Sequence, residues 1–478
     1  MNFHSTPSVL APEAEKSNAA VEAPGLAPAL IEKALGQAKA LQDNVILLWE
    51  GHAPQCDPLL WLESESSPPS FYWKGRYQQT EFAGAQAALV LRGTGPGSLI
   101  ETCSRADAIF ERRIIHPSLP RELQPRFWGG FAFDPHYRSG DKWSGFDDAV
   151  LIFPEALLVR SGTKNRLLLA VTVHPDQTTD DVIHSTERLI ARYQPSPSPV
   201  VTTIPAVQSS FAPDVSQETW TGMVRAALAR IKDGSINKIV LSRQLWLRGI
   251  QLAAWPVMRR LRDRVPSCFH FAFNLGPDRS FVGATPECLF YRSDADVETE
   301  CIAGTILRGD DPQSDQALAE HLLTSPKDRL EHYFVIDDAL ACLGHLCDRL
   351  DAGTSPQILK LATLQHLMTR ARGHLKAGTS TGDILASLHP TPAVGGSPRD
   401  KALEAIRELE PESRGWYAGP VGWYAPDRAE FAVAIRSALL TESGMCIFAG
   451  AGIVQGSTPE EEWRETDAKA LAFLNALQ

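Results

Sequence analysis

The chain has 478 residues, of which 44% are hydrophobic and 22% are charged, which is enough for one large domain or two moderate ones. Its formal net charge of -11 argues against a general nucleic-acid binder and against a protein that binds anionic membranes. No apolar run approaches the ~20 residues of a membrane span, no secretion signal opens the chain, and the eight cysteines lack CxxC spacing. We therefore expect a soluble cytoplasmic protein with free, mostly buried thiols.

The first half of the chain reads as a sheet with few helices. Residues 1–24 are rich in Ala, Ser, Pro and Glu, which predicts a disordered N-terminus. A helix is expected over 29–41, where apolar residues recur at helical spacing. Short apolar runs predict strands at 45–49, 71–73, 88–91, 126–135, 150–153 and 167–173. The stiff PSPSP segment at 195–199 marks a soft boundary, and we find no catalytic constellation before it.

The second half alternates long helices with strands. Ser216 is expected to cap a helix that Gly234 ends, because apolar residues recur between them at helical spacing. Another long helix is expected over 325–349, and a last one after Pro459. Strands are predicted at 238–247, 269–274, 281–283, 289–291, 417–423, 430–440 and 445–448. Runs of strands interrupted by a few long helices indicate an α+β fold.

The stretch 449–469, AGAGIVQGSTPEEEWRETDAK, combines glycines, a turn and a carboxylate-rich helix start. Glycines let a bound group approach the backbone, and amide hydrogens at a helix start attract anions. Glu462 and Glu465 are three residues apart and share one helical face. Beside an anion-binding loop, this pair suggests a divalent cation that bridges to an acidic ligand. The alternative is that the acids only complement the helix dipole and face solvent.

A second acidic pair lies in the segment SPKDRLEHYFVIDD, where Asp328 and Glu331 are also three residues apart on a predicted helix. Glu331 borders the apolar face of that helix. Two such pairs on two helices could surround one Mg²⁺, with some ligands bound directly and others through water. The alternative is an ordinary capping arrangement, with Ser325 as the cap and Asp328 as its partner.

Lys238 and Glu287 are candidates for acid–base chemistry. Lys238 starts an apolar strand, and a lysine that loses its hydration or lies beside cations has a lowered pKa and can act as a base. Glu287 follows a Gly-Ala-Thr-Pro turn, and a carboxylic acid in a partly dry pocket has a raised pKa and can donate a proton. The alternatives are a lysine that extends its amine to solvent and a solvated turn carboxylate.

Arg436, His389 and a pair of glycines are further notable features of the second half. Arg436 lies inside EFAVAIRSALL, and an arginine in a buried strand is costly unless it is paired. A substrate carboxylate is one partner, and Glu430 or another acid is the alternative. His389 begins HPTPAVGGSP and is either a supporting site residue or a loop histidine stiffened by proline. Gly395 and Gly396 lack the spacing of a nucleotide-binding fingerprint.

Taken together, these segments resemble the chorismate-utilising enzymes, which include the isochorismate, salicylate, anthranilate and aminodeoxychorismate synthases. The resemblance runs from about 216 to 469 and rests on KIVLSR, FVGATPECL, CIAGT, SPKDRLEH, HPTPAVGG, RGWYAGPVGW, AIRSA and the stretch 449–469. It implies one α+β fold with two stacked antiparallel sheets flanked by helices. Residues 25–210 would form the strand-rich N-terminal part of this fold, and 211–478 the chorismate-binding catalytic part.

Particular positions point to the isochorismate synthase branch of this family. Lys238 stands where anthranilate synthases typically have Gln, which points to water as the nucleophile and to no glutaminase partner. Ala303 stands where aminodeoxychorismate synthases usually carry Lys, and HPTPAVGG looks like the isochorismate synthase version of its segment. The resemblance thus implies Mg²⁺-dependent conversion of chorismate to isochorismate by a monomer. Ile306 stands where relatives often have Arg. This departure bears on the structure of the local loop and not on the residues named for the chemistry.

The resemblance also implies a role for each acid and base. Lys238 would deprotonate the water that attacks ring C2, and Glu287 would protonate the departing C4 hydroxyl from the opposite face of the ring. Two alternatives stay open. A salicylate synthase shares the lysine and would further eliminate pyruvate, whereas a non-catalytic chorismate-binding subunit would need neither group. The downstream fate of isochorismate, in quinones, a siderophore or salicylate, also stays open.

The metal and the substrate have their own implied residues. Glu331 and Glu465 would bind Mg²⁺ directly. Asp328 and Glu462 would bind it through water. The substrate would be held by side chains and by backbone amides, and the implied positions are Gly304, Thr305, His389, Tyr417, Arg436, Gly450, Gly452 and Lys469.

Overall fold

The computed structural model describes residues 26–65, 67–76, 80–137, 140–193, 212–276, 278–353, 355–360 and 364–477. The predicted disordered segment 1–24 and the PSPSP linker at 195–199 lie outside these residues. The boundary predicted at 210 lies outside them too, so the division of the chain into two parts stays a prediction. Strands from the two parts are hydrogen-bonded to one another: Ser70–Lys74 pairs with Phe269–Gly276, and Phe127–Phe131 pairs with Pro420–Tyr424.

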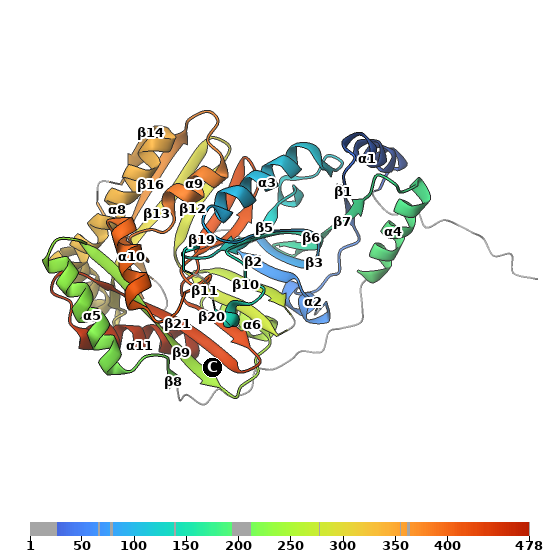
Figure 1. Ribbon diagram of the computed structural model, residues 1–478. Helices are drawn as coiled ribbons and strands as arrows, with labels where there is room; N and C mark the ends of the chain where they lie inside the picture. The colour runs from blue at the N-terminus through green and yellow to red at the C-terminus, as the bar shows by residue number, and fades with distance from the viewer. Residues whose placement is uncertain are drawn as a thin grey trace, which may run out of the picture.

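One antiparallel sheet takes strands from both halves of the chain (Figure 1). Its strands are β1 (Val45–Gly51), β2 (Ser70–Lys74), β3 (Thr80–Gly93), β6 (Ala149–Ser161), β7 (Lys164–Val173), β9 (Lys238–Arg248), β10 (Phe269–Gly276), β11 (Arg279–Thr285), β20 (Ser437–Thr441) and β21 (Gly444–Ile453). Their hydrogen-bonded order is β9, β21, β20, β11, β10, β2, β3, β6, β7 and β1. The short strands at its edges are β8 (Ala212–Pro213) and β17 (Gly396–Ser397), which pair with β9, and β4 (Ile114–Ile115), which runs parallel to β1.

A second antiparallel sheet branches from the first at β6. Its other strands are β5 (Phe127–Phe131), β12 (Cys288–Ser293), β13 (Asp296–Leu307), β14 (Cys347–Ala352), β15 (Gln357–Lys360), β16 (Leu364–Leu375), β18 (Pro420–Tyr424) and β19 (Arg428–Val433). From β6 the order is β5, β18, β19, β12, β13 and β16, and both β14 and β15 pair with β16. The first half of β6 pairs with β5 and its second half with β7, so this long strand belongs to both sheets.

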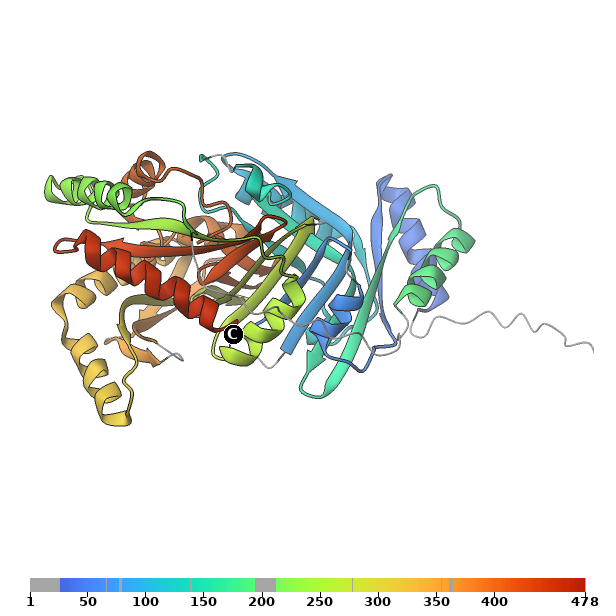
Figure 2. The same ribbon diagram turned by 90° about the horizontal axis from the view of Figure 1, so that it is seen from below.

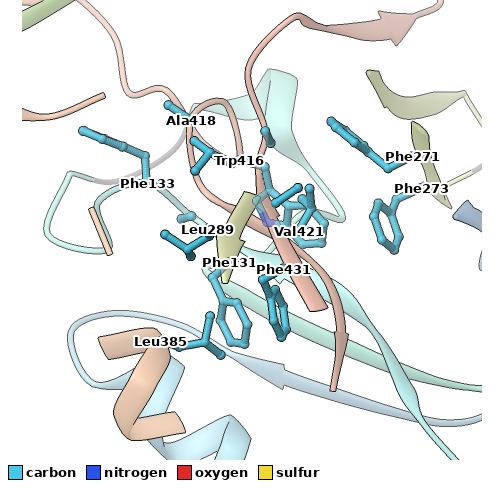
Figure 3. Close-up of a cluster of buried hydrophobic side chains, with 14 of the residues drawn as sticks. Phe131, Phe133, Phe271, Phe273, Leu289, Leu385, Trp416, Ala418, Val421 and Phe431 are labelled. Carbon is cyan, nitrogen blue, oxygen red and sulfur yellow. The ribbon is translucent and has the colours of Figure 1, made fainter. Parts of the chain in front are cut away.

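Aromatic side chains fill the space between the two sheets (Figure 3). Phe273 of β10 packs against Trp416, which precedes β18, with ring centroids 5.6 Å apart. Phe71 of β2, in the first sheet, packs against Trp128 of β5, in the second, at 5.1 Å. All four rings are buried, and each contributes about 1.5–3 kcal/mol to the stability of the fold. The predicted α+β architecture with two stacked antiparallel sheets is therefore confirmed.

Helices cover the outer faces of the sheets (Figure 1). They are α1 (Pro28–Leu41), α2 (Pro58–Ser64), α3 (Ser98–Arg112), α4 (Thr179–Arg192), α5 (Gln217–Lys232), α6 (Ala254–Arg264), α7 (Pro312–Thr324), α8 (Pro326–Leu346), α9 (Thr381–Leu388), α10 (Arg399–Leu409) and α11 (Pro459–Asn475), with short 3₁₀ turns at Arg121–Leu123 and Asp141–Trp143. Helices α2, α6 and α11 pack on the first sheet, and α8 packs on β13 and β16 of the second. Figure 2 shows α1 and α4 together at one end of the molecule, where they cover β1 and β7.

The predicted strand over 430–440 is wrong as a single strand. β19 ends at Val433 and β20 begins at Ser437. Between them Arg436 has a φ of 50°, in the left-handed region, which a strand residue does not adopt. Arg436 therefore lies in the connection between two strands and not in the middle of one, so its side chain is free to leave the alternation of the sheet.

Other boundaries also shift. The helix predicted over 325–349 ends at Leu346, because the next residues form β14 on the edge of the second sheet. The strand predicted over 417–423 begins only at Pro420, after Ala418 with a φ of 62°. The first half holds the helices α1 to α4, more than its sequence suggested, since the acids and arginines of α3 and α4 obscured their apolar faces.

All eight cysteines are free, and six of them are buried, as predicted. The other two, Cys56 and Cys342, are half-buried. Among the helices of the described residues, none combines the length and the apolar character needed to cross a lipid bilayer.

Candidate active site

A cavity of about 330 Å³ lies beside β9 and β21, between strand β13 and helices α8 and α11. Its lining combines apolar side chains with charged ones of both signs, as small-molecule sites do. Most of the predicted site residues line it, namely Glu287, Gly304, Thr305, Asp328, Glu331, Tyr417, Arg436, Gly450, Gly452, Glu465 and Lys469. The fold thus brings together residues that are up to 182 positions apart, counted from Glu287 to Lys469.

Glu287 lies in the turn between β11 and β12. Its backbone N–H donates to the hydroxyl of Thr285 at 3.2 Å, and its carbonyl accepts from the backbone N–H of Val433 at 3.1 Å. Burial raises the pKa of the Glu287 carboxyl to about 7, against the opposing effect of Lys238 and Lys469. The carboxyl therefore holds a proton in a large fraction of molecules at neutral pH, which is what a general acid requires.

Lys238 is the first residue of β9 and is completely buried behind the cavity lining. Its Nζ lies 2.9 Å from Oε1 of Glu331 on α8. Pairing with β17 at Ser397 fixes the start of the strand and so the position of the lysine. The amine points toward the site and not toward solvent, which excludes the extended-lysine interpretation.

Glycines of β21 make room for this pair. A Cβ atom at Gly452 would lie 2.6 Å from Oε1 of Glu331 and 3.4 Å from Cε of Lys238. At Gly450 it would lie 3.1 Å from the hydroxyl of Tyr417. Because alternate residues of a strand face the same side, both glycines open one face of β21 to the cavity.

Helix α11 carries two acids and a lysine at helical spacing. The Nζ of Lys469 donates to the carbonyl of Gly450 at 2.9 Å and to Oε1 of Glu465 at 2.6 Å. Burial alone would raise the pKa of Glu465, but Lys469 and Lys327 outweigh it and lower that pKa. Glu462 lies behind the lining, where burial and the neighbouring Glu465 raise its pKa.

Asp328 takes part in the capping arrangement and lines the cavity as well. Its carboxylate accepts a hydrogen bond from the Ser325 hydroxyl, whose oxygen accepts from the backbone N–H of Asp328 at 3.3 Å. Gly304, with a φ of 75°, allows β13 to approach this turn, since a Cβ there would lie 3.0 Å from Cβ of Asp328. The helix cap thus holds an acid at the cavity wall, and the two interpretations of Asp328 are compatible.

Carboxylates from two helices supply oxygen ligands of the kind that Mg²⁺ prefers: Asp328 and Glu331 on α8, with Glu462 and Glu465 on α11. Both carboxylate oxygens of Glu462 are buried with no hydrogen-bond partner among the described residues, although the Nζ of Lys327 lies 3.5 Å from one of them. As their side chains stand, no three His, Cys, Asp or Glu residues of the described ranges form a group that could hold a metal ion. The chemistry of these four carboxylates therefore fits a divalent cation. Such a cation would compete with lysine side chains for the carboxylate oxygens.

Arg436 faces the cavity from the connection between β19 and β20. No acid of the described residues forms an ion pair with its guanidinium, and burial lowers its pKa. Glu430, the alternative partner, instead accepts from the indole N–H groups of Trp73 at 3.0 Å and Trp423 at 3.3 Å. Burial raises the pKa of the nearby Tyr417 to about 12, so its hydroxyl stays a hydrogen-bond donor. This part of the site favours an anionic ligand.

Three ionisable residues of the lining were not predicted as site residues, namely His321, Lys327 and His366. Nδ1 of His366 lies 3.0 Å from the hydroxyl of Thr305, and burial lowers the pKa of this histidine to about 3, which keeps it neutral. Lys327 directly precedes Asp328 in the motif SPKDRLEH, in which the signal for a site came from the acids and not from the lysine. His366 stands on β16, a strand that the sequence did not predict because basic residues interrupt its apolar pattern.

His389, in contrast, is not part of the lining. Its Nε2 lies 3.0 Å from the carbonyl oxygen of Phe133, and burial lowers its pKa to about 4. It follows α9 directly and joins that end of the helix to the segment after β5. The contact that the structure shows for His389 is therefore one within the fold, outside the cavity lining, and its role toward the substrate stays a prediction.

The chain is similar in sequence and in fold to known proteins. The family described as chorismate binding enzyme matches residues 31–478. Isochorismate synthase MenF of Bacillus subtilis is 30% identical over 465 residues, which cover 93% of this chain and 96% of that protein. The salicylate biosynthesis isochorismate synthase of Pseudomonas aeruginosa is 33% identical over 453 residues, 93% of each chain. The solved structure of MenF, the menaquinone-specific isochorismate synthase from Escherichia coli, matches with a TM-score of 0.77 and 28% identity, covering 94% of this chain and 100% of that one. The chain therefore belongs to the family of chorismate binding enzymes.

Proposed function

We propose that this protein is an isochorismate synthase, which converts chorismate to isochorismate. The observation that carries the proposal is the presence, around one cavity, of a buried amine at Lys238 and a buried carboxyl at Glu287 that holds a proton near neutral pH. Relatives with this name align with nine-tenths of the chain, which supports the same assignment.

The reaction exchanges one hydroxyl for another and needs one base and one acid. Lys238 accepts a proton from water as the water oxygen forms a bond to ring C2. Both ring double bonds shift by one position, from C1=C2 and C5=C6 to C1=C6 and C4=C5, and the C4–O bond breaks, while Glu287 donates its proton to the departing hydroxyl, which leaves as water. The atoms balance, because one water enters and one leaves. Proton transfer from solvent returns both groups to their starting state.

The charges of the site suit a substrate with two carboxylates. Arg436 lacks an acidic partner among the described residues and can bind one of them. The hydroxyl of Tyr417 and the ammonium of Lys469 lie on the same lining and can donate to it as well. Gly450 and Gly452 leave the backbone of β21 accessible at this wall.

We assign the metal site to the two acidic helices. Glu331 and Glu465, which line the cavity, would hold Mg²⁺ directly, and Asp328 and Glu462 would hold it through water. When bound, the ion would fix the ring carboxylate of the substrate and neutralise negative charge. The protein's own part is to keep three carboxylates at one wall of the cavity and that of Glu462 behind them, on helices that the core holds in place.

Product analysis tests this function. Purified protein is incubated with chorismate and Mg²⁺, and the products are separated by chromatography. We expect isochorismate as the product. Accumulation of salicylate and pyruvate would instead identify a salicylate synthase. Binding of chorismate without any turnover would identify a non-catalytic subunit, and either result would reject the proposal.

The metal assignment predicts a specific loss on Glu465→Gln. This change removes one anionic ligand, so we expect Mg²⁺ to bind about tenfold more weakly or worse. Isothermal titration calorimetry of Mg²⁺ into the substrate-free protein measures this without relying on turnover. Glu460→Gln is the control, since Glu460 is an exposed acid on the same helix. Equal Mg²⁺ affinities of the two variants would remove Glu465 from the metal site.

The close approach at β21 predicts that Gly452→Ala is harmful to turnover but not to folding. The added methyl would displace the Glu331 carboxylate from its contact with Lys238. We expect kcat to fall about tenfold or more with little change in melting temperature. Gly344→Ala is the control, because Gly344 lies on α8 with nothing within 4 Å of an added Cβ. A normal kcat in Gly452→Ala would show that this contact is dispensable.

A further inference from the structure

The N-terminal half contributes a buried arginine next to the proposed acid. Arg76 follows β2, and its guanidinium donates to the carbonyl of Pro286, the residue before Glu287. It also forms an ion pair with Glu300 of β13. The side chains of Arg76 and Glu300 are each only 2% exposed, so this ion pair is formed away from solvent.

We propose that Arg76 and Glu300 are a positioning pair for Glu287: the guanidinium fixes the turn that carries the acid and neutralises the carboxylate buried near it. The proposal deepens the function proposed above and rests on Glu287 being the general acid. Neither Arg76 nor Glu300 belongs to the cavity lining, so both would act through Glu287 and not on the substrate.

The turn has a small set of fixed contacts, and Arg76 supplies one of them. The Glu287 backbone supplies further ones through its hydrogen bonds with Thr285 and Val433. Phe269, whose ring centroid lies 5.4 Å from the guanidinium carbon of Arg76, limits the positions that the guanidinium can adopt. A planar guanidinium can bond a carbonyl and a carboxylate at once, which an ammonium group does less well.

The same pair acts on the charge of Glu287. Glu300 raises the pKa of Glu287 and Arg76 lowers it, so the two effects oppose each other. Arg370 also reaches Glu300, at 3.1 Å, from the more exposed side. Ionisable groups from several elements shift the pKa of Glu287 or have their own pKa shifted by it. These groups include Arg76, Lys238, Glu300, Cys301, Tyr417 and Lys469.

This arrangement makes predictions of opposite sign for two variants. Glu300→Gln removes a negative charge, which lowers the pKa of Glu287 by about one unit. Arg76→Met removes a positive charge, which raises that pKa by a similar amount, and it also frees the turn. We therefore expect Arg76→Met to lower kcat about tenfold or more with KM changed little. Arg76→Lys keeps the charge and should recover part of kcat with the pKa near that of the parent.

Two measurements read the pKa of Glu287 independently. The first is the pH profile of kcat/KM. The second is the infrared band of the protonated carboxyl, assigned to Glu287 as the band that Glu287→Gln removes, and it requires no turnover. Arg372→Gln is the control: Arg372 of β16 pairs at 2.7 Å with Glu298, which lies on β13 like Glu300, but the Arg372 side chain is 67% exposed.

The expected result is a pKa that moves down in Glu300→Gln, up in Arg76→Met and not at all in Arg372→Gln. Shifts in the same direction, or none, would overturn the proposal and leave the pair as part of the fold only. If Arg76→Met does not fold, the other two variants still test the proposal. The pKa of Glu287 is expected to fall in Glu300→Gln and to stay near the parent value in Arg76→Lys. If the parent protein makes no isochorismate, the proposed function fails, whereas the infrared titration still tests the pair.

Discussion

Replacing Lys238 with Ala is expected to lower kcat for isochorismate formation by about 10² or more while the protein stays folded. The reason is that the buried amine is the group we assign to proton removal from water, and an alanine leaves no base in its place. Glu331, which loses its partner, is 20% exposed on its side chain and can be hydrated instead. Steady-state rates with chorismate and Mg²⁺, together with a melting temperature, measure both outcomes.

Two further variants separate a base from a simple positive charge. Lys238→Arg keeps the charge, but a guanidinium does not give up its proton near neutral pH, so we expect it to be as inactive as the alanine variant. Lys142→Ala is the matched control, because Lys142 is a largely buried lysine that pairs with Glu412 outside the cavity lining. Near-normal turnover in Lys238→Arg would contradict the assignment of Lys238 as the base.

Glu287→Gln is expected to lower kcat by a similar factor, about 10² or more. Glutamine matches the shape of the acid but has no proton to transfer to the departing hydroxyl. In the parent protein the acid must be protonated, so its active fraction is complete below its pKa and declines above it. With a pKa of about 7, kcat/KM should fall as pH rises through neutrality. Rates measured between about pH 5 and pH 9 give this profile, because that range brackets the pKa of Glu287.

The alkaline decline should disappear in Glu287→Gln, because the group that causes it is gone. Glu430→Gln is the control: Glu430 is also a buried carboxyl with a pKa raised by burial, but it lies outside the cavity lining and accepts from two indole N–H groups. We expect Glu430→Gln to keep both the rate and the decline. A profile that keeps its decline without Glu287 would assign the acid to another residue.

Part of this site could be predicted because its residues break local patterns, whereas Gly304, Thr305, Tyr417 and Lys469 were expected only from the family resemblance. Lys238 is the first residue of an apolar strand, and Glu287 lies between a turn and an apolar strand. Near the start of α8 and of α11, two acids lie three residues apart and so share one helical face. Each of these signals lies within a few residues of sequence. The same is true of the fold class, since runs of strands and a few long helices indicate α+β.

The remaining site residues depend on contacts between distant segments. Arg76 reaches Pro286 because β2 pairs with β10 of the other half, and nothing near Arg76 in sequence signals this. His366 enters the site through the pairing of β13 with β16. The left-handed backbone of Arg436 breaks what reads as one apolar strand, and hydrophobicity alone carries no sign of φ. Long-range register and backbone conformation are the parts that the pattern of residues does not encode locally.

The central claim is that Lys238 activates solvent water, whose oxygen replaces the C4 hydroxyl that Glu287 protonates. The most direct test is to let the purified protein convert chorismate in ¹⁸O-labelled water and to analyse the first isochorismate formed by mass spectrometry. We expect one labelled oxygen, at C2, and release of the original C4 oxygen to solvent. Isochorismate without the label would contradict the account, because it would mean that the hydroxyl moves within the substrate and that no water is activated.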